Sequence, residues 1–292
     1  MRIRFTLAAL AGLGVLSGCG KDVSGVDTQL SEAAFIRYVN AVPDTSSLDF
    51  RFVDGNIEGS PQYANVAFRQ FTAYQRIRPG LRQMKVFTNP QAYANSAAVA
   101  VQTHVDTTFT FEPNARYTIV SYGFARAGSL PKERLVIYRD ELPAALTATQ
   151  VGVRGIHLAP AAGNVDLYVR TSETPAAISG APTAANVAPL GATAYLALAA
   201  RPTTGTLSYR FDITTPGSTT AIPLNAFDGR NLLGVVGTPA QNPLAGFQVG
   251  RTAITVAILP PSVVGSRAPQ TAAFLTATAL FMPDKALDVT EP

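Results

Sequence analysis

Short runs of β-branched, aromatic and other apolar residues recur along the chain from about residue 34 onward, and clusters of Pro, Gly, Asn and Asp separate them. Runs of this length and composition are typical of β-strands. The pattern predicts strands over residues 35–42, 48–53, 81–87, 117–124 and 135–138 in the first half and 151–159, 165–170, 206–213, 232–236, 254–259 and 274–281 in the second. No long amphipathic helix is indicated, and residues 195–200 could form a helical turn at most. We therefore expect an all-β fold.

The two halves of the chain carry the same residues at a nearly constant spacing. Three residues of the first half recur 117 positions later: Arg37 as Arg154, Pro43 as Pro160 and Asp49 as Asp166. Farther along the spacing is 121, with Asn65, Val66, Ala67 and Tyr74 recurring as Asn186, Val187, Ala188 and Tyr195. Such self-similarity predicts a duplicated unit with small insertions in its loops. A longer insertion is expected in the second copy, at residues 237–250 or 260–269.

The start of each unit fits a β-hairpin with a four-residue loop, at residues 43–46 in the first unit and 160–163 in the second. That register places Asn40 opposite Asp49, and His157 opposite Asp166. Period-two alternation then places five apolar residues of each hairpin on one face, which we expect to be the core. These residues are Val39, Ala41, Leu48, Phe50 and Phe52 in the first unit and Ile156, Leu158, Val165, Leu167 and Val169 in the second.

These opening segments resemble a known family. The passage Ile36-Arg37-Tyr38-Val39-Asn40-Ala41-Val42-Pro43-Asp44, followed by Leu48-Asp49-Phe50-Arg51-Phe52-Val53-Asp54-Gly55, is similar to the start of a DUF4397 domain. The second copy resembles it through Arg154, His157, Pro160, Val165, Asp166, Tyr168 and Val169. Asn40 replaces the family's histidine, and Ala161 replaces its Asp after the proline. The resemblance implies exported bacterial domains, often in tandem, with an all-β fold and no assigned activity.

The first residues are typical of a bacterial export signal. Arg2 and Arg4 precede an apolar run over residues 5–16, which is shorter than the roughly 20 residues that a membrane-spanning helix needs. The segment Leu16-Ser17-Gly18-Cys19 resembles the lipobox of bacterial lipoproteins, which implies cleavage after residue 18 and acylation of Cys19. An ordinary secretory cleavage site with a chance cysteine is the alternative.

Four segments are predicted: a signal peptide at residues 1–18, a lipidated flexible tether at 19–33, a first sandwich at 34–146 and a divergent second one at 147–292. Both are expected to be antiparallel β-sandwich domains of the immunoglobulin-like or transthyretin-like kind. Gly20 and Lys21 follow the cysteine, in place of the Asp that retains lipoproteins in the inner membrane, which favours the outer membrane. The membrane is thus one predicted partner, reached through the lipid.

Composition narrows the possible function classes. The 292 residues carry a formal net charge of +4, which falls to +2 without Arg2 and Arg4, so we expect no nucleic-acid partner. Cys19 is the only cysteine, which leaves no disulfide and no thiolate zinc site. The Gly-x-Ser-x-Gly, Walker and His-Glu-x-x-His motifs are missing. We therefore expect no catalytic residue, no cofactor and no metal.

Two histidines are the candidate bases. If His157 faces Asp166, the carboxylate could orient the imidazole for base or ligand chemistry. We favour a structural pair, because Asn40 takes the equivalent position and an Asn can replace His in a structural bond but not in acid–base catalysis. His104, beside Asp106 in a Thr-rich segment, is expected in a solvated loop.

Arg37 and Arg154 have equivalent places on the first strand of each unit. Period-two alternation puts them on the same side of the strand as the predicted core residues. We expect each to lay its stem over apolar surface and to pair with a carboxylate at the rim of its sandwich. Capture of a ligand anion is the alternative.

Other charged residues are expected to be structural. The basic run Arg69, Arg76, Arg78, Arg82 and Lys85 is expected to form the polar outer face of a strand pair, with contact to lipid phosphates or an acidic polysaccharide as the alternative. Three aspartates alternate with turn residues in a pattern that does not fit a calcium loop: Asp44, Asp49 and Asp54.

The sequence therefore predicts an exported, lipid-anchored envelope protein that serves as a non-enzymatic binding or structural module, with an envelope glycan or a protein as its partner. Two alternatives stay open. One is a hydrolase that acts on envelope polymers through two converging carboxylates. The other is a subunit of a larger envelope assembly.

Overall fold

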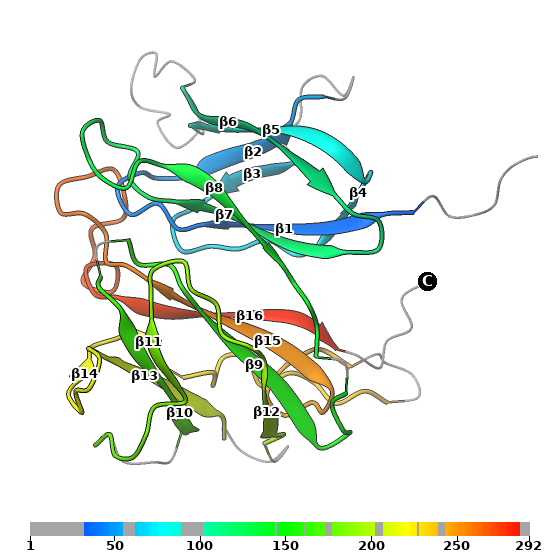
Figure 1. Cartoon of the computed structure of the whole chain (residues 1–292), viewed down its shortest axis with the longest axis vertical. Helices are drawn as coiled ribbons and strands as arrows, with labels where there is room; N and C mark the ends of the chain where they lie inside the picture. Colours follow the sequence, from blue (N-terminus) through cyan, green and yellow to red (C-terminus); the bar gives the residue numbers. More distant parts are fainter. Residues whose placement is uncertain are drawn as a thin grey trace, which may run out of the picture. The chain divides into compact units, whose positions relative to one another are not determined.

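A computed structural model of the chain describes residues 32–54, 62–88, 102–143, 145–160, 162–172, 177–201, 207–226, 228–238 and 243–286. In this part of the chain all regular structure is β, in sixteen strands and four sheets (Figure 1). The predicted signal peptide and most of the predicted tether lie outside the described residues. Within those residues there is no helix long and apolar enough to cross a membrane.

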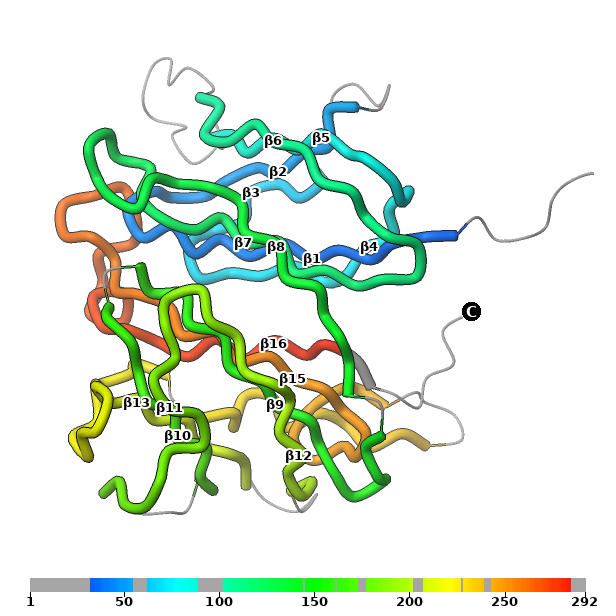
Figure 2. Tube along the Cα trace, in the orientation of Figure 1, coloured from blue at the N-terminus to red at the C-terminus, as the bar shows by residue number. Residues whose placement is uncertain are grey.

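The first sandwich consists of two four-stranded sheets. The sheet that faces the second half of the chain has the order β4-β1-β7-β8, formed by Gln75–Ile77, Ala34–Asn40, Arg116–Tyr122 and Arg134–Arg139. The other has the order β3-β2-β5-β6, formed by Tyr63–Val66, Leu48–Phe52, Gly80–Thr88 and Thr103–Phe111. After β8 the chain passes to the second sandwich (Figure 2).

The second sandwich has corresponding strand orders. One sheet is β12-β9-β15-β16, formed by Leu196–Ala199, Gln150–His157, Thr252–Leu259 and Thr278–Ala286. The other is β11-β10-β13-β14, formed by Ala184–Val187, Val165–Thr171, Tyr209–Thr214 and Ala221–Ile222. The all-β class and the two sandwiches are thus confirmed.

Several predicted elements differ from the structure. Residues 232–236 form no strand and make only an isolated bridge, from Val235 to Leu244. Residues 195–200 belong largely to strand β12 and not to a helical turn. The Thr-rich strand β6 was not predicted, although Val105, Phe109 and Phe111 alternate with polar residues along it and face the core.

The central pair of each facing sheet is parallel, whereas every other strand pair is antiparallel. Strand β1 runs parallel to β7, and β9 runs parallel to β15. Parallel strands are usually covered on both faces, and all eight residues of β15 are buried. The facing sheets are therefore covered on their outer side as well as on their inner side.

Strands β1 and β2 lie in different sheets, so the predicted hairpin is wrong. Residues 41–47 form a corner that carries the chain from one sheet of the sandwich to the other. The same holds for β9 and β10 in the second half. Neither Asn40 and Asp49 nor His157 and Asp166 are therefore cross-strand neighbours.

Three clusters of buried apolar residues hold Ala33–Pro292 together as one compact unit. The first fills the first sandwich and includes Leu48 and Phe50. The second fills the second sandwich and includes Val165 and Leu167. These four residues were correctly predicted to be core.

The third cluster lies between the two sandwiches and combines residues of both. It includes Val39 and Ala41 from the first half and Ile156 and Leu158 from the second. These residues were predicted to share a face with Leu48 or Val165. Because the chain crosses to the other sheet at the corner, the face of β1 that points into its own sandwich is the opposite of the predicted one. That inward face carries Ile36 and Tyr38, and the other face of β1 meets the second sandwich.

Candidate functional site

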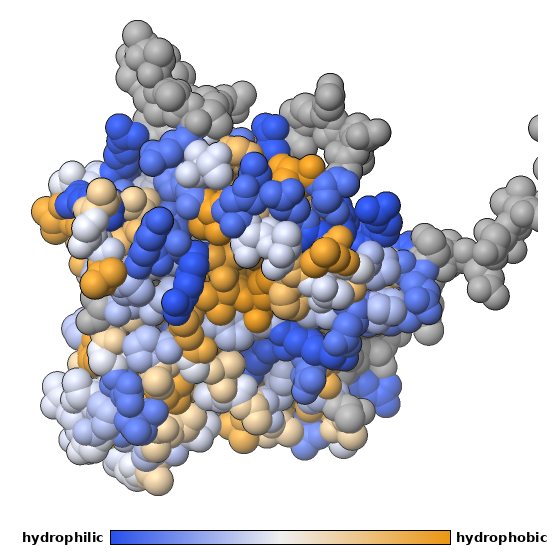
Figure 3. Space-filling view, turned by 45° about the horizontal axis from the view of Figure 1, so that its top comes forward, coloured by the Kyte–Doolittle hydropathy of each residue, from blue (hydrophilic) through white to orange (hydrophobic). Residues whose placement is uncertain are grey.

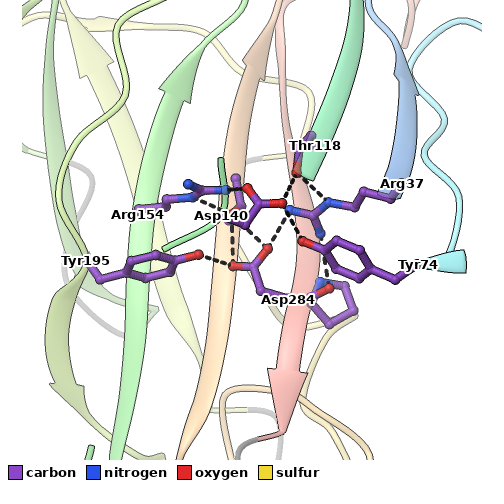
Figure 4. Close-up of polar contacts among 9 residues, drawn as sticks. Arg37, Tyr74, Thr118, Asp140, Arg154, Tyr195 and Asp284 are labelled. Carbon is purple, nitrogen blue, oxygen red and sulfur yellow. Dashed lines mark hydrogen bonds and ion pairs between the residues drawn. The ribbon is translucent and has the colours of Figure 1, made fainter. Parts of the chain in front are cut away.

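A network of buried charges joins the facing sheets of the two sandwiches (Figure 4). Arg37 on β1 is 0% exposed, and Arg154 on β9 is 5% exposed. Arg37 lies on the same face of β1 as Val39, and Arg154 lies on the same face of β9 as Ile156. Both faces are directed at the other sandwich. The two arginines therefore lie between the sandwiches, and the predicted location at the rim is wrong.

Each arginine pairs with an aspartate of the other sandwich. The Arg37 guanidinium donates through Nη2 to Asp284 on β16, and Arg154 donates through its Nη2 to Asp140, which follows β8. Both aspartate side chains are 0% exposed. A carboxylate partner was predicted for each arginine. That the partner would belong to the other sandwich was not predicted.

Hydroxyl groups complete the first half of the network. The Nε of Arg37 donates to Oγ1 of Thr118 on the neighbouring strand β7, over 2.8 Å. The Thr118 hydroxyl in turn donates to Asp140 over 2.8 Å, and the Tyr74 hydroxyl donates to the same carboxylate over 2.7 Å. The Tyr74 ring also lies 4.8 Å from the Arg37 guanidinium carbon.

The second half repeats these contacts with its own residues. The Nε of Arg154 donates to Thr255 over 2.8 Å, and the Thr255 hydroxyl contacts Asp284 at 2.8 Å. The Tyr195 hydroxyl donates to Asp284 over 2.7 Å. Each carboxylate thus accepts from a Thr and a Tyr of its own sandwich and from the Arg of the other, as in the self-complementary interface of a two-fold dimer.

The protonation states of this network are held by its own charges. Burial alone would lower the pKa of Arg37, but Asp284, Tyr74 and Asp140 outweigh burial and raise it above its ordinary value. Arg154 behaves likewise, with Asp140, Tyr195 and Asp284 raising its pKa. Burial raises the pKa of Tyr74 well above its ordinary value. The tyrosines therefore stay neutral donors, and two cations balance two carboxylates.

The predicted His157–Asp166 pair is not formed. His157 Nε2 contacts the carbonyl oxygen of Gly163 at 3.0 Å, and the backbone N–H of Ala159 donates to Nδ1 over 3.4 Å. These contacts fit a neutral imidazole that carries its proton on Nε2. His157 therefore stabilises the corner between the two sheets.

Asn40 makes the equivalent contacts in the first sandwich. Its Nδ2 donates to the Ser46 carbonyl over 3.2 Å, and its Oδ1 accepts from the Val42 N–H over 3.1 Å. An amide thus does in one corner what the imidazole does in the other. The structural interpretation of His157 agrees with these contacts, although its partner is not the predicted one.

Asp49 and Asp166 accept hydrogen bonds from the third strand of each unit. Asp49 accepts from the Asn65 N–H over 2.8 Å, and Asp166 accepts from the Asn186 N–H over 2.7 Å. Both asparagines have a φ of 54°, in the left-handed region that Asn tolerates better than most residues. Each aspartate therefore holds a left-handed residue within the third strand, where the strand shifts its register against the second.

The predicted basic run does not form one surface. Arg69 is 9% exposed, Arg82 pairs with Asp54, and Lys85 pairs with Asp106. On the face shown in Figure 3, groups of hydrophilic side chains are separated by apolar surface.

Arg69 joins the two sandwiches a second time. Its guanidinium donates to the carbonyl oxygens of Pro260, Ala273, Phe274 and Thr276, in the loop between β15 and β16. Burial lowers the pKa of Arg69 to about 10, which still leaves it charged at neutral pH. The long β15–β16 loop of the second sandwich is thus tied to the first.

A polar cleft of about 300 Å³ lies near the end of strands β5 and β6. It is lined by Thr88, His104, Arg126 and Arg267, among others. The His104 side chain is 8% exposed and lies on β6, so the predicted solvated loop is wrong.

Three side chains form a hydrogen-bonded chain at this cleft. His104 Nδ1 lies 2.7 Å from Glu133 Oε2, and His104 Nε2 lies 2.8 Å from the Thr88 hydroxyl. Oε1 of Glu133 is buried and has no hydrogen-bond partner among the described residues. The order hydroxyl, imidazole and carboxylate is the arrangement that activates a nucleophile in many hydrolases. The three residues are far apart in the chain, so no sequence motif indicates this set.

Comparison with known proteins supports the resemblance for part of the chain. Residues 34–168 match the family model described as a domain of unknown function, DUF4397. The matched segment spans the first sandwich and continues through β9 into β10 of the second.

No curated protein matches the chain. A crystal structure of a candidate cell adhesion protein from Parabacteroides distasonis ATCC 8503 is similar over 86% of this chain and 99% of that one, with 9% identity and a TM-score of 0.19. Similarity at that level carries no argument about function.

Replacing Arg37 with Met should destabilise the protein strongly, because it leaves Asp284 buried without its counter-charge. Breaking a buried pair in this way costs about 3–5 kcal/mol. Arg139→Met is the matched control, since its pair with Glu112 is at least half exposed and is expected to contribute about 1 kcal/mol or less. Urea unfolding measures both. Equal losses in the two variants would contradict the role given to Arg37.

Replacing His157 with Asn should reduce the loss of folding stability that the wild type shows at acidic pH. In the folded state the pKa of His157 lies below its ordinary value. Burial lowers this pKa by more than the hydrogen bond to the Gly163 carbonyl raises it. The unfolded chain takes up this proton near pH 6.5, so stability falls as the pH drops below about 6.5. In His157→Asn that part of the loss should vanish. We expect the free energy of unfolding in urea to differ less between pH 7.5 and pH 5.5 in the variant than in the wild type. The same difference in both proteins would argue against the role given to His157.

Proposed function

We propose that this protein is an exported, lipid-anchored protein of the bacterial cell envelope, whose two DUF4397-like sandwiches form one rigid, non-enzymatic binding or structural module. The anchor is the acylated Cys19, and the outer membrane is the favoured location. Its partners are the membrane and an envelope glycan or protein.

The observation that carries the proposal is the buried Arg–Asp network. Asp140 and Asp284 are two converging carboxylates, which a glycan hydrolase would need. Both are 0% exposed and are occupied by Arg, Thr and Tyr donors. A substrate could reach them only if the two sandwiches separated. The arrangement supports a fixed relation between two domains, which suits a module that presents a surface.

Corresponding geometry supports the tandem repeat. The two sandwiches share their strand orders and their parallel central pairs. Asn65 and Asn186 have the same left-handed φ of 54°, and Arg69 and Leu190 have φ values of 66° and 68°. Such rare backbone angles at matched positions favour a second, divergent copy of one unit.

Replacing Cys19 with Ser should release the protein from the membrane. The wild type is expected to sediment with membranes and to carry acyl groups on its N-terminal residue, because several chains on one residue give a stable anchor. Fractionation and mass spectrometry of the N-terminal peptide measure both. Ser24→Ala, in the predicted tether, is the matched control and should remain anchored. An unmodified residue 19 in the native host would overturn the anchor.

A second candidate function is a hydrolase that uses Thr88 as its nucleophile, His104 as its base and Glu133 to orient the base. The hydrogen-bonded chain at the polar cleft favours it. Arg126 and Arg267 line the same cleft and would suit an anionic substrate. The small exposed fractions, 4% for Thr88 and 8% for the His104 side chain, speak for the binding module instead.

Thr88→Val separates the two functions, because it removes the hydroxyl and keeps the shape of the side chain. We expect the wild type and Thr88→Val to release p-nitrophenol from p-nitrophenyl acetate at the same rate, close to that of buffer. Ser266→Ala, at the same cleft, is the control. A wild-type rate tenfold or more above that of Thr88→Val would instead establish the hydrolase.

A further inference from the structure

The second sandwich contains a cavity of about 510 Å³ between the strands of its two sheets. Its walls are mainly apolar and include Val153, Leu167, Val187 and Phe211, with Tyr195 among the few polar side chains. Sites for small molecules usually have about 300–1,000 Å³ and apolar walls. The cavity thus has the size and lining of a ligand site.

Among the described residues of the first sandwich, aromatic rings fill the equivalent place. The Tyr38 and Phe50 ring centroids are 5.2 Å apart, and the Tyr63 ring stacks on Tyr38 at 6.3 Å. Phe52 completes the group at 5.3 Å from Phe50. Tyr38, Phe50 and Tyr63 are 0%, 0% and 4% exposed.

The internal repeat identifies what replaces these rings. Tyr38 follows Arg37 and Gly155 follows Arg154, so the two are equivalent. By the same spacing of 117, Phe50 becomes Leu167 and Phe52 becomes Val169. By the spacing of 121 that holds farther along, Tyr63 becomes Ala184, and the two pair with Phe50 and Leu167 in the same way. None of the four replacements is aromatic, and all four line the cavity.

The edge strand above the cavity is also more open than its counterpart. Tyr63 and Val66 on β3 are buried, at 4% and 5% exposure. Ala184 and Val187 on β11 are only half-buried. A small molecule therefore has access from solvent without unfolding of the sandwich.

Hydrogen bonding in the first sandwich indicates what polar group a ligand would carry. The Tyr63 hydroxyl donates to the Ile36 carbonyl over 2.6 Å. The residue equivalent to Ile36 is Val153, which lines the cavity. The partner of the Tyr38 hydroxyl is Ser121, at 2.7 Å, and the register of the parallel pairs makes Ile258 its equivalent. One acceptor for a phenolic hydroxyl is thus kept and the other is lost.

We propose that this cavity binds a small aromatic molecule with a single phenolic hydroxyl, whose ring takes the place that Tyr63 occupies in the first sandwich. The hydroxyl donates to the Val153 carbonyl, and the ring packs against Leu167, Val187 and Phe211. Apolar cavities lined in this way bind ring compounds such as benzene in other proteins. The inference is independent of the anchor and of the polar cleft.

Titration of the full mature chain with p-cresol tests the proposal. The wild type should bind one equivalent in isothermal calorimetry, and cyclohexanol, which has a hydroxyl but no aromatic ring, should bind at least tenfold more weakly. Ala184→Tyr places the ring of the first sandwich into the cavity and should weaken p-cresol binding at least tenfold. Ala185→Tyr is the matched control, since Ala185 is exposed on the same strand, and should bind as the wild type does.

A reciprocal variant guards against a trivial loss of fold. Tyr63→Ala should open the equivalent space in the first sandwich and raise the stoichiometry from one p-cresol to two. Circular dichroism checks that each variant is folded. If Ala184→Tyr is not folded, Ala184→Phe replaces it, because Phe fills the cavity without a hydroxyl. Absence of saturable p-cresol binding to the wild type would overturn the proposal. Equal binding by folded Ala184→Tyr and Ala185→Tyr would overturn it as well.

Discussion

The structure depends on the exchange of two buried ion pairs between its halves. A buried charge without a partner is very unfavourable, so neither Arg37 nor Arg154 can be buried until the other sandwich supplies an aspartate. Each sandwich thus has a carboxylate with its own Thr and Tyr donors, and the arginine that pairs with that carboxylate comes from the other sandwich. This requirement fixes the pairing of the sandwiches, while the apolar cluster around Val39 and Ile156 provides the contact area.

The exchange also explains the sheet architecture. Strands β1 and β9 carry apolar residues on both faces, one directed at their own core and the other at the partner sandwich. A single chain thereby reproduces the self-complementary surface of a two-fold dimer. The symmetry is broken in one loop and one cavity. Arg69 binds the β15–β16 loop where Leu190 takes the matched position, and the Tyr38 and Tyr63 rings of the first core are replaced by Gly155 and Ala184.

The sequence predicted the fold class, and it predicted less of the site. Alternating apolar residues and turn residues identified most strands, but alternation does not tell a hairpin from a corner, because both place Pro43 at a bend. The hairpin interpretation therefore reversed the faces of Val39 and Ile156. Arg37 shares the face of Val39 and was assigned wrongly with it, and its partner, Asp284, is 247 positions away, so no local pattern could indicate the pair. His104 was assigned to a loop because the Thr-rich strand β6 was not recognised, although Val105, Phe109 and Phe111 alternate along its core side.

The separation of Arg37 from Asp284 has a consequence for biosynthesis. The first sandwich emerges from the ribosome long before β16 does, and during that interval Arg37 lacks the Asp284 carboxylate with which it pairs in the folded protein. Contacts of such long range form late and slow the search for the native state. The N-terminal half must therefore wait, with one apolar face uncovered, for the last strand to arrive. A helper that shields this face during synthesis or transport would shorten the period in which the chain can aggregate.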